Sequence, residues 1–283
     1  MKIFKDIESF RDWRKSKTGT IGFAPTMGAL HDGHLSLIEK SQKNCDFTVV
    51  SIFINPLQFN NIEDFKSYPD TIEEDFKLLE SKKIDVVFIP SKEAMYPKSS
   101  TTIVEETKLS NNLEGESRPG HFKGVTTIVA KLFNIVQPTH AFFGEKDAQQ
   151  LRIIQRMVKD LNFDIEIIPC ETLREESGLA MSSRNENLSS ENRQKANIIK
   201  RGLDLAKIAL DSGEKSATNL KKYIWSKITS EPNSEVLYVS VADSDTLEEI
   251  DNMTNIEILV SVAVKFDGVR LIDNFTYLVP PPE

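Results

Sequence analysis

The segment TIGFAPTMGALHDGHLSLIEKSQKN, residues 20–44, contains in one stretch the pieces that decide the fold. Thr20–Ala24 favours a short β-strand, Pro25–Gly33 is a loop with two glycines, and His34–Asn44 has the character of a helix. A strand, a loop and a helix in this order begin a βαβ unit. In an open α/β sheet this loop lies at the carboxyl end of its strand, where ligands bind.

The alternation of strands and helices continues to residue 169. Thr71–Glu74 (TIEE) has the form of a capping box and predicts the start of a helix. Such alternation predicts a parallel sheet that is covered by helices on both faces. The further expected elements are strands at Phe47–Ile54, Ile84–Pro90, Thr139–Phe143 and Asp164–Pro169, and helices at Thr71–Lys83, Gly124–Val136 and Asp147–Leu161.

The last hundred residues have a different pattern, which predicts a smaller α+β domain. The regular alternation stops near Cys170–Gly178, so we expect a first domain at 1–174 and a second at 175–283, with a hinge near this border. The expected elements of the second domain are helices at Ser189–Ser212 and Ser216–Ser230, and strands at Val236–Ala242, Ile256–Val264 and Val269–Leu278.

Composition narrows the class of protein. The 283 residues fit about two domains, and 35 basic against 43 acidic residues give a net charge of −8, which argues against a general nucleic-acid binder but not against a small anionic ligand. Cys45 and Cys170 form neither a disulfide framework nor a zinc pattern. Phe47–Ile54, the longest apolar run, is far shorter than the ~20 residues of a membrane helix, and Met1–Arg11 is no export signal. We expect a cytoplasmic protein with no nucleic-acid or membrane partner.

Two of the four histidines, His31 and His34, lie in the loop that opens the first βαβ unit. The N-terminus of the following helix suits a phosphate, and Gly28 and Gly33 permit close approach of the backbone. Spacing alone leaves three alternatives open: surface histidines in a turn, phosphate chemistry, or a metal site that would need further ligands.

A family resemblance decides among these alternatives. Residues 25–34 (PTMGALHDGH) resemble the H-x-G-H signature of the HIGH-type nucleotidyltransferases, and the flanking residues resemble the pantoate–β-alanine ligase family. Four further segments agree in the same order, and the five together are highly specific. They are 53–59 (FINPLQF), 118–125 (RPGHFKGV), 143–151 (FGEKDAQQL) and 178–185 (GLAMSSRN).

The resemblance implies a fold and a reaction. The fold would be α/β, with a Rossmann-like parallel sheet domain and a second, smaller α+β domain at the C-terminus that acts as a lid. The reaction would be the ATP-dependent condensation of (R)-pantoate with β-alanine to pantothenate. It would pass through pantoyl adenylate and release AMP and diphosphate. ATP would be a co-substrate with Mg²⁺, and the protein would be a homodimer.

The resemblance also implies the site. The catalytic residues would be His34, as proton donor, together with His31, Lys146 and Arg184. The ATP contacts would be Met27, Gly28, Ala29, Leu30, His31, Asp32, Gly33, His34, Gly144, Glu145, Lys146, Asp147, Leu173, Met181, Ser182, Ser183 and Arg184. The contacts to pantoate and β-alanine would be Pro25, Thr26, Met27, Asn55, Gln58 and Gln150.

Acidic residues near position 75 are the candidates for magnesium. Glu74 and Asp75 fall where the family carries acids, although acids in the first turn of a helix also simply complement its dipole. Relatives read Y-P-R-T just before them, whereas this chain has Asp70 at the position of the arginine. Arg118 and His121 lie either near the site or at a dimer interface, and the sequence does not decide between these places.

Three other functions remain possible at this point. A HIGH-type adenylyltransferase for another acid, or for a phosphorylated precursor, is disfavoured by the asparagine, the paired glutamines and the MSSRN segment. An aminoacyl-tRNA synthetase would need more chain and is disfavoured by the acidic charge. A regulatory module without catalysis is disfavoured by the intact His31, His34, Lys146 and Arg184.

Overall fold

The computed structural model describes residues 1–59, 65, 68–69 and 71–281. Asp70, which stands where relatives carry an arginine, therefore lies outside the described residues. The chain forms two compact units. The first comprises Met1–Glu145 and Gln149–Glu171, and the second comprises Lys146–Ala148 and Thr172–Glu283.

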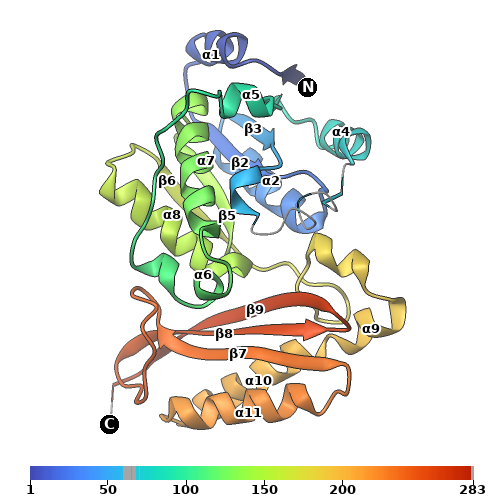
Figure 1. The fold of residues 1–283 in the computed structure, drawn as a ribbon, viewed down its shortest axis with the longest axis vertical. Helices are drawn as coiled ribbons and strands as arrows, with labels where there is room; N and C mark the ends of the chain where they lie inside the picture. The colour runs from blue at the N-terminus through green and yellow to red at the C-terminus, as the bar shows by residue number, and fades with distance from the viewer. Residues whose placement is uncertain (60–64, 66–67, 70, 282–283) are drawn as a thin grey trace. The chain divides into compact units, whose positions relative to one another are not determined.

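The first unit is built on a six-stranded sheet in the order β1-β4-β3-β2-β5-β6, and all of its strands pair in parallel (Figure 1). The chain leaves β2 toward β3 on one side, whereas β5 lies on the other side of β2, so the loop after β2 lies at the point where the strand order reverses. The expected parallel α/β sheet is confirmed. The strands are β1 Lys2–Phe4, β2 Ile21–Thr26, β3 Phe47–Ile52, β4 Val86–Phe88, β5 His140–Gly144 and β6 Glu166–Cys170.

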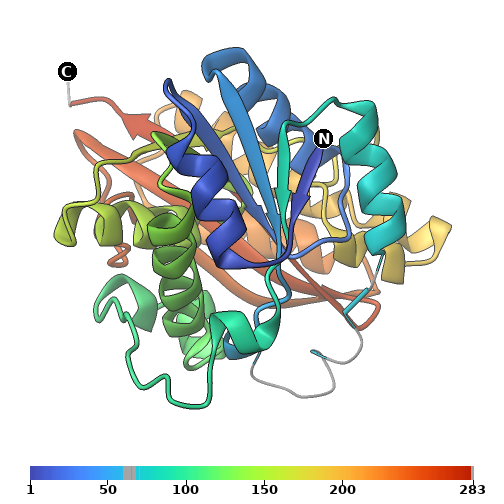
Figure 2. The ribbon, with the colours of Figure 1, turned by 90° about the horizontal axis from the view of Figure 1, so that it is seen from above.

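Helices cover both faces of this sheet because successive strand residues point to opposite faces. Phe23 of β2 packs edge-to-face on Phe133 of α7, with ring centroids 6.3 Å apart. The next residue, Ala24, belongs to the buried cluster that contains Leu35 and Ile38 of α2. Figure 2 shows α1 and α7 on one face. The helices are α1 Ile7–Lys15, α2 Asp32–Asn44, α4 Ile72–Ser81, α5 Lys92–Met95, α6 Glu114–Ser117, α7 His121–Val136 and α8 Ala148–Asp160, and the 3-10 turns are η1 Pro56–Gln58, η2 Leu109–Asn111 and η3 Glu145–Asp147.

Some local features of the first unit differ from the sequence-based expectation. The capping box at Thr71 is wrong: α4 does begin after Thr71, but the threonine side chain makes no capping hydrogen bond. Its ψ of 32° takes the backbone out of the extended conformation that aims a capping hydroxyl at the helix. The sequence analysis also missed β1, which has only three residues. Phe4 is held there by edge-to-face contact with Phe10 of α1, at 5.7 Å between ring centroids.

The second unit is an antiparallel sheet in the order β7-β8-β9 with helices packed against it, which confirms the smaller α+β fold. Leu203 of α10, Leu220 of α11 and Val260 of β8 lie in one buried cluster. The expected helix at Ser189–Ser212 is wrong as a single element, because it is interrupted at residues 196–197. There the backbone tightens, with the Ile199 N–H bonded to the carbonyl of Ala196. The elements are η4 Ser183–Asn187, α9 Ser190–Lys195, α10 Ile198–Asp211, α11 Ala217–Thr229, β7 Ser234–Asp243, β8 Ile256–Phe266 and β9 Val269–Val279.

Within the described part of the chain, no helix combines the length and the apolar character that crossing a membrane requires.

Candidate active site

The loop between β2 and α2 holds an unusual backbone conformation. Gly28 and Ala29 both have positive φ, at 82° and 50°. The Thr26 hydroxyl donates to the carbonyl of Ser51 at 2.8 Å and accepts from the Gly28 N–H at 3.3 Å, which ties the start of the loop to β3. A Cβ at residue 28 would lie 3.0 Å from Asp75 Oδ2, so both the conformation and the space favour glycine here.

Asp75 holds this loop from α4. Its side chain is buried, with 2% exposed, and its two oxygens accept the N–H groups of Ala29 at 3.0 Å and Leu30 at 2.8 Å. Burial raises the pKa of Asp75 above its ordinary value, although the two N–H donors act in the opposite direction. The carboxylate therefore fixes the loop, a role that the sequence analysis did not assign to it.

These surroundings do not fit the predicted magnesium role of Asp75. A direct ligand must offer an accessible oxygen to a hydrated ion, and both Asp75 oxygens face backbone N–H groups in a buried place. Glu74, its neighbour, is exposed. The described residues contain no group of three or more acidic, histidine or cysteine side chains placed to hold a metal ion.

The two histidines lie side by side at the first turn of α2. His31 is the N-cap and its Nδ1 accepts from the Gly33 N–H at 3.1 Å, while His34 Nδ1 accepts from the His31 N–H at 3.4 Å. Their ring centroids are 4.1 Å apart. Because an Nδ1 that accepts carries no proton, each neutral ring carries its proton on Nε2. The pair therefore carries two Nε2–H groups near the positive end of a helix, an arrangement whose charge suits an anion.

The loop after β3 brings a second set of predicted residues to the same place. Asn55 and Gln58 are buried, with 1% and 8% exposed. Asn55 Nδ2 donates to Gln58 Oε1 at 3.0 Å, and Gln58 Nε2 contacts Met27 Sδ at 2.9 Å. The predicted substrate residues Met27, Asn55 and Gln58 are therefore in contact, although they come from two different loops.

Arg118 and His121, whose place the sequence left undecided, lie against Gln58. His121 is buried, and its Nδ1 donates to the Gln58 carbonyl at 2.7 Å. Arg118 Nη2 donates to the same oxygen at 3.4 Å. Both residues thus hold the backbone of a predicted substrate residue. The motif R-P-G-H marked them as part of the family pattern, but only the tertiary contact reveals this partner.

Gly124 of α7 lets the helix backbone touch this loop directly. A Cβ at this position would lie 2.4 Å from the Leu57 carbonyl oxygen and 2.7 Å from the Gln58 nitrogen. The Gly124 carbonyl accepts from Asn55 Nδ2 at 3.0 Å. The absence of a side chain therefore allows the helix backbone to support the predicted site.

The paired glutamines after β5 have different surroundings. Gln149 Nε2 donates to the carbonyls of Leu109 and Asn112, both at 2.7 Å, and its Oε1 accepts from the Glu114 N–H at 3.0 Å. Its amide is thus used to fix the segment around η2 and α6. Gln150, the predicted substrate residue, is only partly buried, and its contact with a substrate stays a prediction.

Lys146 lies in the turn η3, between Gly144 at the end of β5 and the start of α8. It belongs to the second unit, where its carbonyl accepts from Asn274 Nδ2 of β9 at 2.8 Å. Its side chain is partly buried, whereas Glu145 and Asp147 on either side are exposed.

The predicted serine–arginine segment is held by an ion pair of the second unit. Arg174 makes two hydrogen bonds to Asp273, at 2.6 and 3.0 Å, and Asp273 is only 3% exposed. The exposed Leu173 accepts from the Met181 N–H at 3.0 Å, which closes a short hairpin. Two partly buried serines follow, Ser182 and Ser183; Ser182 then caps η4, accepting from the N–H of the exposed Arg184 at 3.3 Å.

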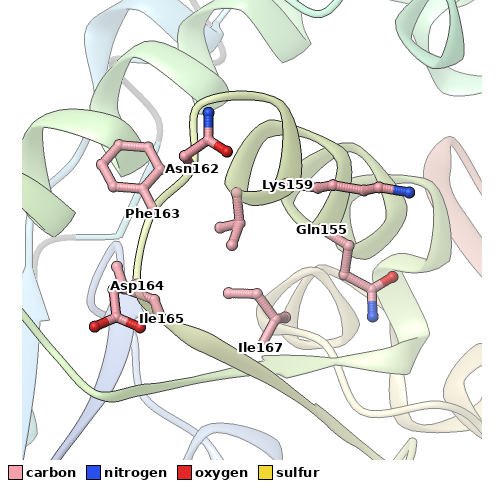
Figure 3. A pocket seen from close by; sticks show the side chains of 8 residues that line it. Gln155, Lys159, Asn162, Phe163, Asp164, Ile165 and Ile167 are labelled. Carbon is pink, nitrogen blue, oxygen red and sulfur yellow. The ribbon is translucent and has the colours of Figure 1, made fainter.

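A hollow of about 570 Å³ lies elsewhere in the first unit, between the end of α8 and the start of β6 (Figure 3). Val158, Phe163, Ile165 and Ile167 form its apolar part. Its lining residues belong to α8, to the segment that leads into β6 and to β6 itself, whereas the predicted residues of the first unit follow the carboxyl ends of β2, β3 and β5. No predicted site residue lines it.

Comparison with known proteins shows the family of the chain. Residues 2–276 match the sequence model of the family described as pantoate-beta-alanine ligase. The chain belongs to this family. It is 49% identical over 274 residues to the pantothenate synthetase of Acetivibrio thermocellus, with 97% of each chain covered. The corresponding protein of Pseudothermotoga lettingae is also 49% identical, over 278 residues, with 97% of this chain and 98% of the relative covered.

Solved structures of the family are similar over nearly the whole chain. The pantothenate synthetase of Thermus thermophilus has a TM-score of 0.91 and 40% identity, covering 99% of this chain and 100% of that one. The ligase of Francisella tularensis, crystallised with β,γ-ATP and β-alanine, has a TM-score of 0.79 and 38% identity, with 97% of each chain covered. The predicted family, fold class and enzyme class, a ligase that forms an amide bond, are confirmed.

Proposed function

We propose that the protein condenses (R)-pantoate with β-alanine to pantothenate at the expense of ATP, through pantoyl adenylate, with release of AMP and diphosphate. The observation that carries this proposal is the contact of the histidine loop with the Asn55–Gln58 segment through Met27. Through this contact, the loop that carries His31 and His34 and the buried amides of Asn55 and Gln58 form one site. The chain that contains this site belongs to a ligase family. The Francisella relative, crystallised with β,γ-ATP and β-alanine, supports the choice of nucleotide and amine.

In the first step, a carboxylate oxygen of pantoate attacks the α-phosphorus of ATP, and the bond to the diphosphate breaks. Negative charge gathers on the phosphate oxygens, so donors that are already aimed lower the barrier. His31 and His34 would donate through Nε2–H, with His34 as the proton donor. Lys146 would supply a compact cation for phosphate, and Ser182, Ser183 and Arg184 would bind the β- and γ-phosphates, with the guanidinium suited to two-pronged contact.

Amides rather than an arginine would bind pantoate. A guanidinium would hold the ground-state carboxylate tightly, and this attraction would fade as the oxygen becomes part of a neutral mixed anhydride. Gln58 and Gln150 bind the substrate without that penalty. If Gln58→Arg both tightened pantoate binding and raised kcat, this explanation would be wrong.

In the second step, the amine of β-alanine attacks the carbonyl carbon of pantoyl adenylate. The carbon–nitrogen bond forms, the bond to the phosphate oxygen breaks, and AMP leaves while the amine loses a proton. The adenylate must be protected from water until then. We propose that the second unit provides this protection as a lid, which predicts a change in solution scattering when ATP and pantoate are added.

Magnesium would enter the site bound to the phosphates of ATP. Mg²⁺ is commonly bound in this way, because it loses its water molecules reluctantly and keeps several of them. Its charge would screen the phosphates. Of the two predicted acids, only the exposed Glu74 stays a candidate, through a water molecule. A homodimer also stays a prediction, which light scattering at several protein concentrations would test.

The two half-reactions provide the test. We expect diphosphate release with ATP and pantoate alone, and AMP release only after β-alanine is added. Loss of one preorganised donor typically costs about 10²–10³ in rate, so His34→Ala should slow diphosphate release by that factor. His140→Ala is the matched control, because that histidine lies at the start of β5, where it contacts Glu166 at the start of β6.

The outcomes separate the alternatives. Normal adenylate formation by His34→Ala would remove this residue from the mechanism. Diphosphate release with another acid, but not with pantoate, would favour an adenylyltransferase of different specificity. Folded protein without either half-reaction would contradict an active ligase.

A further inference from the structure

Tyr96, which follows α5, is joined to the loop after β3 by its ring and by its hydroxyl. The ring centroid lies 6.2 Å from that of Phe53, and the Lys131 ammonium of α7 lies 5.8 Å from it. The hydroxyl donates to Asn55 Oδ1 at 2.8 Å. The ring contacts therefore hold the hydroxyl in place, and they do not depend on it.

The direction of the hydrogen bonds around Asn55 is fixed by backbone groups. The Leu57 N–H can only donate, so the atom that it contacts at 3.4 Å is the amide oxygen. The Gly124 carbonyl can only accept, so the atom that it contacts at 3.0 Å is the amide nitrogen. The Tyr96 hydroxyl must then donate to Asn55.

The same reasoning fixes the amide of Gln58. Asn55 Nδ2 donates, so the atom of Gln58 that faces it at 3.0 Å is the oxygen. The NH₂ group of Gln58 therefore points away from Asn55, toward Met27. A substrate that meets Gln58 from that side encounters a donor, which matches the carboxylate and hydroxyl oxygens of pantoate.

We propose that Tyr96 is a positioning residue for pantoate: its hydroxyl fixes Asn55, which in turn holds the Gln58 amide with its NH₂ group toward the substrate. This inference rests on the proposed binding of pantoate by Gln58. Without the hydroxyl, the described residues leave Asn55 Oδ1 only the long contact from Leu57. A buried acceptor that lacks a good donor is costly, so the Asn55 amide would be held less firmly in this orientation.

The effect should be selective for one substrate. The histidine loop is held by Thr26 and Asp75, and neither of these contacts involves Tyr96. Binding of ATP should therefore not depend on the hydroxyl. A general loosening of the fold would instead weaken both substrates together.

Tyr96→Phe tests the proposal because it keeps the ring and removes one oxygen. In the diphosphate-release assay, we expect kcat/KM for pantoate to fall about tenfold, as for one hydrogen bond that orients a binding group, while KM for ATP changes less than about twofold. Tyr277→Phe is the matched control, since its hydroxyl donates to Asp211 at 2.9 Å in the second unit. It should leave both values unchanged.

A double-mutant cycle separates positioning from stability. In a Gln58→Ala background there is no amide to orient, so Tyr96→Phe should cause no further loss for pantoate. The full tenfold loss in that background, or equal losses for pantoate and ATP with a lower Tm, would overturn the proposal.

Calorimetric titration with pantoate gives a second readout that does not depend on turnover. Wild-type protein that binds pantoate but releases no diphosphate would refute the proposed function; the affinity of Tyr96→Phe for pantoate would then still test the positioning role of Tyr96. An unchanged affinity of Tyr96→Phe for pantoate, or wild-type protein that does not bind pantoate, would refute that positioning role.

Discussion

Replacement of Gly124 by alanine should damage the pantoate side of the site more than it damages the fold. The new Cβ would lie 2.4 Å from the Leu57 carbonyl oxygen, whereas ordinary contact begins near 3.4 Å. Because the obstacle is backbone rather than a flexible side chain, η1 must move away from α7 by about 1 Å. That movement carries Asn55 and Gln58 with it.

The magnitude follows from opposing effects. Alanine is favoured over glycine inside a helix by about 1 kcal/mol, whereas overpacking of a close contact costs about 1–3 kcal/mol. The free energy of unfolding should therefore fall by no more than about 2 kcal/mol. A displacement of about 1 Å at a substrate-binding residue can cost about 10²-fold in activity. The catalytic effect thus exceeds the effect on stability.

The assay is diphosphate release with pantoate and ATP varied in turn, together with urea unfolding. For Gly124→Ala we expect kcat/KM for pantoate to fall about 10²-fold, with a smaller change in KM for ATP. Lys123→Ala, next to it on the same helix, removes only a surface contact to Glu105 at 3.6 Å and should behave like wild type. Unchanged use of pantoate by Gly124→Ala would refute the reasoning.

Four other substitutions test residues of the predicted site and of its supporting contacts. Because burial raises the pKa of Asp75, its contribution to stability is present below the ordinary pKa of the group and is lost as pH rises through the folded-state pKa. In urea unfolding, the stability of wild type relative to Asp75→Asn should therefore decrease as pH rises above about 4. Arg174→Ala removes the ion-pair partner of the buried Asp273, which is left with the N–H of Asn274, and should lower the unfolding free energy by about 3 kcal/mol. An unchanged urea midpoint would contradict this. Gln149→Leu should lower Tm and spare KM for pantoate, whereas Gln150→Ala should raise KM and spare Tm; the reverse pattern would exchange their roles.

The sequence predicts the fold and those candidate site residues whose polar side chains belong to recognisable motifs. His31, His34 and Gln58 stand in short patterns whose spacing and flanks are specific to a family. The parallel sheet follows from alternating runs of strand and helix character. Motifs and periodicity are local signals, so both can be found without tertiary contacts.

The supporting residues could not be predicted in this way. Asp75 in the sequence is one acid among several at the start of a helix, and its partners lie 45 and 46 positions earlier. Tyr96 meets Asn55 across 41 positions, and nothing near it in the sequence signals a hydrogen bond. Their roles depend on burial and on the direction of their hydrogen bonds, and both are determined by tertiary packing.

The structure of the loop between β2 and α2 also changes which groups we expect to bind a phosphate. The sequence pointed to free N–H groups at a helix N-terminus, but the described structure uses most of them internally. Thr26, Asp75 and the two histidine Nδ1 atoms take the N–H groups of Gly28, Ala29, Leu30, His31 and Gly33. Because these amides already hold the loop, we expect side chains, those of His31 and His34 foremost, to recognise a phosphate. Substitution of a histidine would therefore remove both a donor to the substrate and an acceptor that shapes the loop.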